Sequence, residues 1–119
     1  MQTEKWKNLE VWKLSNELAL KVYIVTKDFP KEEIYGLTSQ LRRAALSVPT
    51  NIVEGHSRSG DKELARFLDI ALGSLGETKY LLSFFKELGY IPENSFFALD
   101  KLAQDTCAKL WSFYKVVKK

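Results

Sequence analysis

The sequence predicts an all-α protein, an up-down-up-down bundle of four helices. Apolar residues recur at steps of three and four in four separate segments, and proline or glycine separates each segment from the next. No stretch alternates apolar and polar residues with the period of two that a strand requires, and no β-hairpin turn signal is present. We expect helices at about residues 9–28, 36–54, 61–88 and 93–117, joined by short loops in a single domain spanning residues 1–119.

The first and last segments have clear boundaries. Val11, Leu14 and Leu18 begin an apolar stripe along one face of the first helix. Pro30 ends this helix, because the residue before a proline is pushed out of the helical region. Pro92 suits the first turn of the last helix. Three of the last five residues are lysines, which complement the dipole at the end of that helix.

The second segment contains a proline that we expect to distort it. Leu37 and Leu41 begin its apolar face. Pro49 removes a backbone donor and clashes with the carbonyl of Ala45, so we predict a kink or a break nearby. Gly55 is expected to close this helix in a left-handed conformation.

The third segment is the longest and carries two internal glycines. Ser59 or Asp61 is expected to cap its beginning, and Gly89 is expected to stop it. Gly73 and Gly76 each weaken the helix by about 1 kcal/mol relative to alanine. Another helix that crosses closely at this point would explain both glycines.

Three of the four segments carry apolar residues outside their core-facing stripe. These residues are Trp12, Ala19, Tyr23, Ile70, Phe84, Phe97 and Trp111. Monomeric proteins rarely expose large contiguous apolar patches, so we expect these side chains to form contacts between copies in a homo-oligomer. The alternative is a wide stripe that wraps around the edge of the core, because aromatic side chains are often half-buried.

Composition excludes several classes of protein. The chain has 119 residues, of which 45% are hydrophobic, and this excludes intrinsic disorder. No apolar run approaches the ~18–20 residues that a membrane span needs, and the N-terminal MQTEKWKNLE lacks the apolar region of a signal peptide. One cysteine cannot form an internal disulfide. We therefore expect a cytoplasmic protein that does not contact a membrane.

Residues for catalysis or metal binding are scarce. The single histidine, His56, and the single cysteine, Cys107, are far apart in sequence. Neither a zinc site nor the paired Glu-x-x-His motifs of a di-iron bundle can be built from them. Cys107 is expected at the boundary of the core. The loop GHSRSGDK lacks the spacing of a phosphate-binding loop, and we interpret it as an ordinary capped turn. We predict no catalytic residue, metal, cofactor or small-molecule substrate.

Basic residues are the most suggestive polar feature. The formal net charge of +3 permits an anionic partner. The candidate residues are Arg42, Arg43, Arg58, Lys62 and Arg66. An antiparallel pairing of the second and third helices would gather the last three near its tip, where they could contact the phosphates of RNA or DNA. The alternative is an exposed, salt-bridged face. The carboxylates interspersed among these cations are Glu54, Asp61, Glu63 and Asp69.

Several motifs make the chain resemble a known family. The motifs are LEVW, FPKEE, GLTSQLRRAA, SVPTNIVEG and FLDIALGSLGE, and the resemblance covers about Leu9 to Tyr90. The chain resembles the four-helix-bundle proteins encoded within intervening sequences of bacterial 23S rRNA genes, also called S23-type proteins. More distantly, it resembles the accessory proteins of diversity-generating retroelements, which are pentameric and basic. The resemblance implies a ring-shaped homopentamer and, through the second group, nucleic-acid binding. It supplies no catalytic residues. The basic positions within its pattern are Arg42, Arg43, Arg58 and Arg66.

The leading functional hypothesis is therefore a non-enzymatic, oligomeric bundle that binds nucleic acid, RNA in particular, through a modest basic surface. The rival hypothesis is a protein–protein interaction module or scaffold that does not bind nucleic acid. The two hypotheses differ in whether the basic residues or the exposed apolar residues meet the partner.

Overall fold

The computed structural model describes residues 4–119, and most of them are helical. The four α-helices are α1 (Glu10–Thr26), α2 (Leu37–Ser57), α3 (Asp61–Glu87) and α4 (Glu93–Lys118). Two short 3-10 helices, η1 (Lys5–Asn8) and η2 (Lys31–Glu33), precede α1 and α2. No strand occurs in this part of the chain, so the all-α prediction is confirmed.

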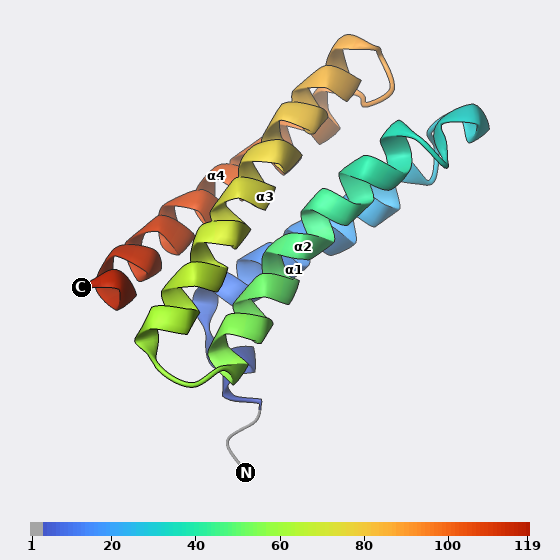
Figure 1. The fold of residues 1–119 in the computed structure, drawn as a ribbon. Coiled ribbons are helices and arrows are strands. Elements are labelled where there is room, and N and C mark those ends of the chain that lie inside the picture. The colour runs from blue at the N-terminus through green and yellow to red at the C-terminus, as the bar shows by residue number, and fades with distance from the viewer. Residues whose placement is uncertain (1–3) are drawn as a thin grey trace.

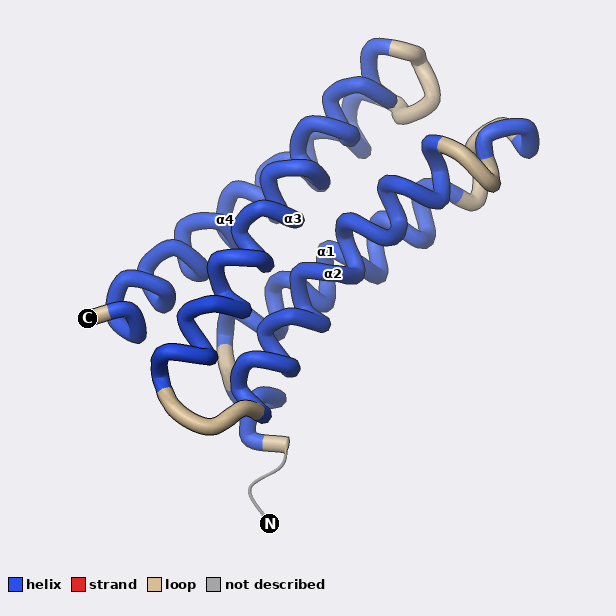
Figure 2. The backbone as a smooth tube through the Cα atoms, in the orientation of Figure 1, coloured by secondary structure: helices blue, strands red, loops and turns tan. Residues whose placement is uncertain are grey.

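The helices form the predicted up-down-up-down bundle (Figure 1). α2 is the neighbour of α1 and α3, and α4 is the neighbour of α3 and α1, whereas the backbones of the diagonal pairs do not approach each other closely within residues 4–119. The bundle measures 43 × 24 × 20 Å, and its connections lie at the two ends (Figure 2). The α2–α3 turn therefore shares one end with the C-terminus of α4, and the α1–α2 and α3–α4 connections share the other (Figure 1).

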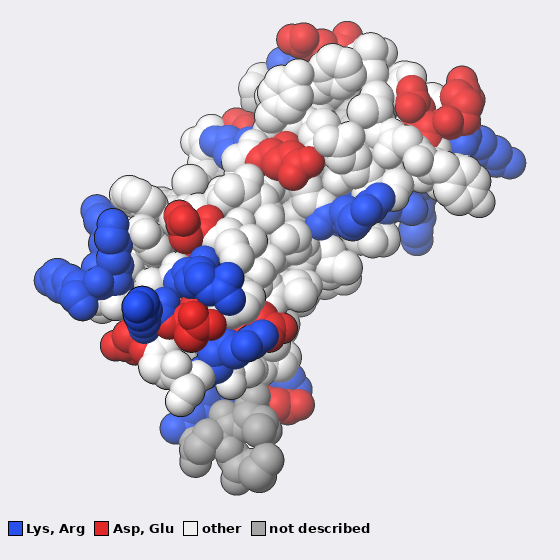
Figure 3. Space-filling model, viewed as in Figure 1, with Lys and Arg blue, Asp and Glu red and all other residues white. Residues whose placement is uncertain are grey.

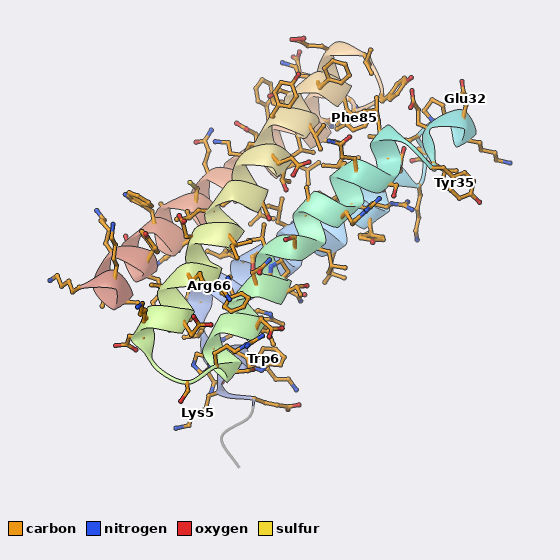
Figure 4. The ribbon with its side chains drawn as sticks, in the orientation of Figure 1. Lys5, Trp6, Glu32, Tyr35, Arg66 and Phe85 are labelled. Carbon is orange, nitrogen blue, oxygen red and sulfur yellow. The ribbon has the colours of Figure 1, made fainter. Side chains whose placement is uncertain are left out.

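The predicted apolar stripes meet along the axis of the bundle. Four leucines with no exposed surface, one from each helix, are Leu18, Leu41, Leu68 and Leu110. Phe85 is fully buried toward the end opposite the α2–α3 turn (Figure 4). Its ring centroid lies 4.7 Å from that of Phe29 and 5.8 Å from that of Tyr90. Because burying one large apolar side chain contributes about 1.5–3 kcal/mol, this interior is the main source of stability.

The break predicted near Pro49 does not occur. α2 is continuous through this residue, which is buried. The hydroxyl of Thr50 and the amide of Asn51 donate to the carbonyls of Leu46 and Ser47, each at 2.8 Å. Proline costs about 3 kcal/mol in the interior of an isolated helix. The packing of α2 against both α1 and α3 offsets this cost.

Two glycines near the α2–α3 turn have roles that differ from our predictions. Gly55 does not end α2, but lies buried inside it. A β-carbon added at Gly55 would lie 2.8 Å from the Cβ of Phe67, so a glycine is required for this approach of α3. Gly60 is the left-handed residue, with a φ of 88°. It precedes α3 in place of the predicted caps Ser59 and Asp61, and no side chain of the described residues caps the helix there.

Gly73 and Gly76 lie on the outward side of α3. Nothing lies within 4 Å of a β-carbon added at either position. The close helix contact that we considered for them is therefore absent among the described residues. The two glycines instead expose the backbone of α3 to solvent between Ile70 and Tyr80, two large side chains that are themselves exposed.

Alanine substitutions at the two kinds of glycine should change the free energy of unfolding in opposite directions. Gly55→Ala forces a β-carbon onto Phe67 and should destabilise the bundle by about 1–3 kcal/mol. Gly73→Ala meets open space and should stabilise it by up to about 1 kcal/mol, because alanine is the better helix former. Urea unfolding followed by circular dichroism measures both. Equal effects at the two positions would contradict the packing at Gly55.

Candidate nucleic-acid interface

Three of the five predicted basic residues flank the α2–α3 turn. Arg58 follows the last residue of α2, Lys62 lies in the first turn of α3, and Arg66 lies one turn further on. All three side chains are exposed at one end of the bundle. Figure 4 shows Arg66 at the same end as Trp6 and far from Glu32. The predicted clustering at the tip of the helical hairpin is therefore present.

The ring of Phe67 restrains two of the guanidinium groups. The Cζ atoms of Arg58 and Arg66 lie 5.2 Å and 4.5 Å from the centroid of this ring. Phe67 is only 9% exposed and lies against Gly55 of α2. A cation over an aromatic ring at an exposed site gains about 0.5–1 kcal/mol. Both arginine head groups are therefore held beside the turn.

Carboxylates neutralise part of this charge. Nη2 of Arg58 lies 2.8 Å from Oε2 of Glu54, and Nε of Arg66 lies 3.4 Å from Oε2 of Glu63. The four side chains are 41–56% exposed, so each pair adds only about 0–1 kcal/mol to stability. Lys62 takes part in no salt bridge in the described chain. Basic and acidic side chains are accordingly interspersed at this end (Figure 3).

Arg42 belongs to a different part of the molecule. Its Nε donates to Oγ1 of Thr26 at 2.8 Å, and its Cζ lies 4.9 Å from the ring centroid of Tyr23. Both partners are on α1, so Arg42 joins α1 to α2. We therefore assign this arginine to the helix contact and remove it from the candidate basic surface.

Arg43 is also separate from the cluster at the turn. Its Nη2 donates to Oγ of Ser39 at 3.4 Å, and its side chain lines a groove between α2 and α3. Arg43 and Arg58 are fifteen residues apart in sequence, which is about 22 Å along a helix. One phosphate group therefore cannot contact both residues.

The groove beside Arg43 has a mixed polar and apolar lining and lies toward the end of the bundle opposite the turn. Its volume is about 660 Å³. Nε2 of Gln40 donates to Oε2 of Glu77 at 3.1 Å, and the hydroxyls of Ser47 and Ser74 lie 2.8 Å apart. These pairs join α2 to α3 along the groove. Sequence periodicity gave no signal for them, because the pairs depend on how two helices are aligned.

At the same end of the bundle, the hydroxyl of Tyr90 donates to Oε2 of Glu33 at 3.3 Å. Burial, followed by the negative charges of Glu33 and Glu32, raises the pKa of Tyr90 above its ordinary value. A tyrosine phenol is protonated at neutral pH even without this shift, so it donates to Glu33 there. This contact ties η2 to the α3–α4 connection.

Four of the seven residues expected at subunit contacts are exposed. They are Tyr23, Ile70, Phe97 and Trp111, with exposures of 40%, 41%, 57% and 48%. Leu20, Ile24 and Tyr80, which the sequence analysis did not name, are more exposed, at 59%, 62% and 65%. The spacing of Leu20 and Ile24, one helical turn apart and outside the core stripe, was the available signal.

The other three residues are wholly or partly covered within one copy. Ala19 is 3% exposed in the apolar core, so the prediction that it contacts another copy is wrong. Trp12 is half-buried, and its ring centroid lies 4.9 Å from that of Trp6. Phe84 is half-buried, with its ring centroid 6.4 Å from that of Phe85.

The few residues that could bind a metal ion or act in catalysis are dispersed over the structure. Among residues 4–119 there is no group of three or more His, Cys, Asp or Glu side chains that could hold a metal ion. Cys107 is half-buried against the core, at the boundary position expected for it. His56 is half-buried in the last turn of α2. Within the same residues, no helix has the length and apolar character needed to cross a membrane.

Known proteins share both the motifs and the fold. The sequence pattern of the 23S rRNA-intervening sequence protein family matches residues 7–112. The chain belongs to this family. A crystal structure of a protein with unknown function from the S23 ribosomal protein family of Bacteroides thetaiotaomicron superposes with a TM-score of 0.81. The two chains are 24% identical, over 88% of this chain and 95% of that one, and this likeness shows a shared fold. None of the curated proteins compared with this family member matches it.

Replacing Arg42 and Arg43 one at a time should separate a structural role from a surface role. Arg42→Ala removes the hydrogen bond to Thr26 and the ring contact with Tyr23, so it should lower the free energy of unfolding by about 1–2 kcal/mol. Arg43→Ala should change it by less than about 0.5 kcal/mol, because Arg43 is exposed. Chemical unfolding of both variants measures the difference. The assignment of Arg42 is wrong if the two losses are the same.

Proposed function

We propose that this family member is a non-enzymatic homo-oligomer that binds RNA through phosphate contacts at the end of the bundle with the α2–α3 turn. The restraint of Arg58 and Arg66 against the ring of Phe67 supports this most strongly. Cations that are already positioned lose less conformational freedom when a phosphate binds. Lys62 adds an exposed cation without a salt-bridge partner in the described chain.

Lysines of α4 add positive charge at the same end. Residues 109–119 contain four lysines and no acidic residue. The C-terminus of α4 and the α2–α3 turn lie together at this end (Figure 1). An assembly of several copies would repeat this charge and sum its field. The charge pattern thus supports an RNA partner independently of the family name.

Exposed apolar residues on two helices support self-association. Leu20 and Ile24 lie on α1, and Ile70 and Tyr80 lie on α3. α1 and α3 are diagonal in the bundle, so their outward faces point away from each other. A contact between two different faces of successive copies forms a closed ring when the rotation between copies permits it. We propose five copies in this ring, the number implied by the resemblance in sequence.

Variants of the two faces test this assembly. The unmodified chain should sediment well above the 13.7 kDa of one copy. Leu20→Lys on α1 or Tyr80→Lys on α3 should each reduce the mass to that of a monomer, because each places a charge in an apolar contact. Each variant keeps one intact face, so an equimolar mixture should form a two-copy species.

Gln104→Lys, on an exposed position of α4, is the matched control and should assemble normally. A chain that sediments at 13.7 kDa at micromolar concentration would rule out the ring.

Charge reversal at the turn tests the RNA contact. Lys62→Glu should weaken binding to a short RNA about tenfold at about 50 mM salt, and should make the affinity less dependent on salt up to about 200 mM. Lys62 is exposed, so the fold should not change. Lys31→Glu is the charge-matched control, and η2 lies at the opposite end of the bundle. Lys31→Glu should change the affinity for the RNA by less than about twofold relative to the unmodified chain, because salt screens a charge that is far from the bound RNA.

Removal of a carboxylate at the turn should change the affinity for RNA in the opposite direction. Glu63→Gln releases Arg66 from its partner and should strengthen RNA binding. Filter binding measures all three variants. An affinity that is absent at low salt, or that does not depend on salt, would count against phosphate recognition.

A protein–protein interaction module is the second candidate. The pairing of Arg58 with Glu54 and of Arg66 with Glu63 favours it, because each pair reduces the charge available to RNA. This candidate requires that no nucleic acid copurifies with the untreated protein. It also requires that Lys62→Glu leaves partner binding unchanged.

A further inference from the structure

The C-terminal part of α4 presents aromatic and basic side chains together. Trp111 is 48% exposed, and its ring is stacked on that of Tyr114, with centroids 5.5 Å apart and planes 23° apart. Tyr114 is half-buried and packs against the core. The covered tyrosine therefore fixes the orientation of the exposed tryptophan ring.

Two lysines lie beside this pair of rings. Nζ of Lys115 is 6.0 Å from the ring centroid of Trp111, and Nζ of Lys118 is 5.5 Å from that of Tyr114. Neither lysine takes part in a salt bridge within the described chain. In contrast to Arg58 and Arg66 at the α2–α3 turn, these cations have no carboxylate partner among residues 4–119.

We infer that Trp111, Tyr114, Lys115 and Lys118, together the α4 platform, bind single-stranded nucleic acid. An unpaired base stacks on the exposed ring of Trp111, and the adjoining phosphates contact the two lysines. Stacking of bases on aromatic side chains together with a cationic surface is the usual way in which proteins hold single strands. The inference rests on the proposed function and makes its ligand more specific. The bound nucleic acid must be single-stranded, because bases inside a duplex cannot stack on Trp111.

A single strand fits the α4 platform better than a second copy of the chain or a membrane does. An apolar contact with another copy would bury the lysines beside Trp111, which is costly without carboxylate partners. A lipid surface needs a broad apolar face. In residues 109–119 the large apolar side chains that are exposed are Trp111 and Val116, because Phe113, Tyr114 and Val117 pack against the core.

Comparison of a single strand with a duplex tests the inference. The probes are an oligouridylate of about 12 nucleotides and an RNA duplex of the same length. Trp111→Ala should weaken binding of the oligouridylate about tenfold and change binding of the duplex by less than about twofold. Trp111→Phe keeps an aromatic ring and should retain single-strand binding.

A second readout reports stacking directly. The oligouridylate should quench tryptophan fluorescence more strongly in the unmodified chain than in Trp111→Ala, which keeps the paired rings of Trp6 and Trp12. Lys115→Gln should make single-strand affinity less dependent on salt.

The remaining outcomes overturn the inference. The first is that Trp111→Ala weakens binding of the oligouridylate and of the duplex equally. The second is that Trp111→Ala leaves binding of the oligouridylate unchanged. The third is that Trp111→Ala lowers the sedimentation mass, which would place Trp111 between copies. Tighter binding to phosphatidylserine vesicles than to oligouridylate would indicate a membrane surface instead. If the unmodified chain binds neither RNA, the proposed function fails as well. If duplex binding persists and depends on Lys62, only the α4 platform is refuted.

Discussion

The close approach of α2 and α3 at Gly55 is the constraint on which the candidate interface depends. The missing side chain at Gly55 lets Phe67 of α3 lie directly against α2. Phe67 then lies within reach of both Arg58, which follows α2, and Arg66, which lies on α3. A larger residue at position 55 would push the helices apart and change the position of both cations. One packing contact thus sets the geometry of the charged end.

The same two helices meet differently further from the turn. There, hydroxyl and amide groups add contacts at the surface of the helix pair, as in Ser47–Ser74 and Gln40–Glu77. Polar pairs of this kind hold two helices at a greater separation than a glycine contact does. α2 and α3 accordingly diverge away from their turn (Figure 1), and a groove lies between them. The bundle is therefore closed at its basic end and more open at the other.

Helical periodicity predicted the fold because it reports which side of each helix is apolar, and that property needs no knowledge of neighbouring helices. The candidate site was less predictable, because its residues depend on alignment between helices. Arg42 and Arg43 are adjacent in sequence, yet only the positions of Thr26 and Tyr23 on α1 explain why Arg42 is part of a helix contact. Ala19 was assigned to the surface because its spacing from Trp12 and Tyr23 places it outside the core stripe of an isolated helix, whereas a second neighbouring helix covers it in the bundle.

The exposed glycines of α3 also affect its bending stiffness. Without β-carbons at Gly73 and Gly76, the middle of this helix has lower intrinsic stability than its ends. This weaker part adjoins Ser74, at the level where the contact with α2 has become polar. Thermal bending of α3 should therefore concentrate there. Such a motion would widen or narrow the groove while the glycine contact keeps the arginine-bearing turn rigid.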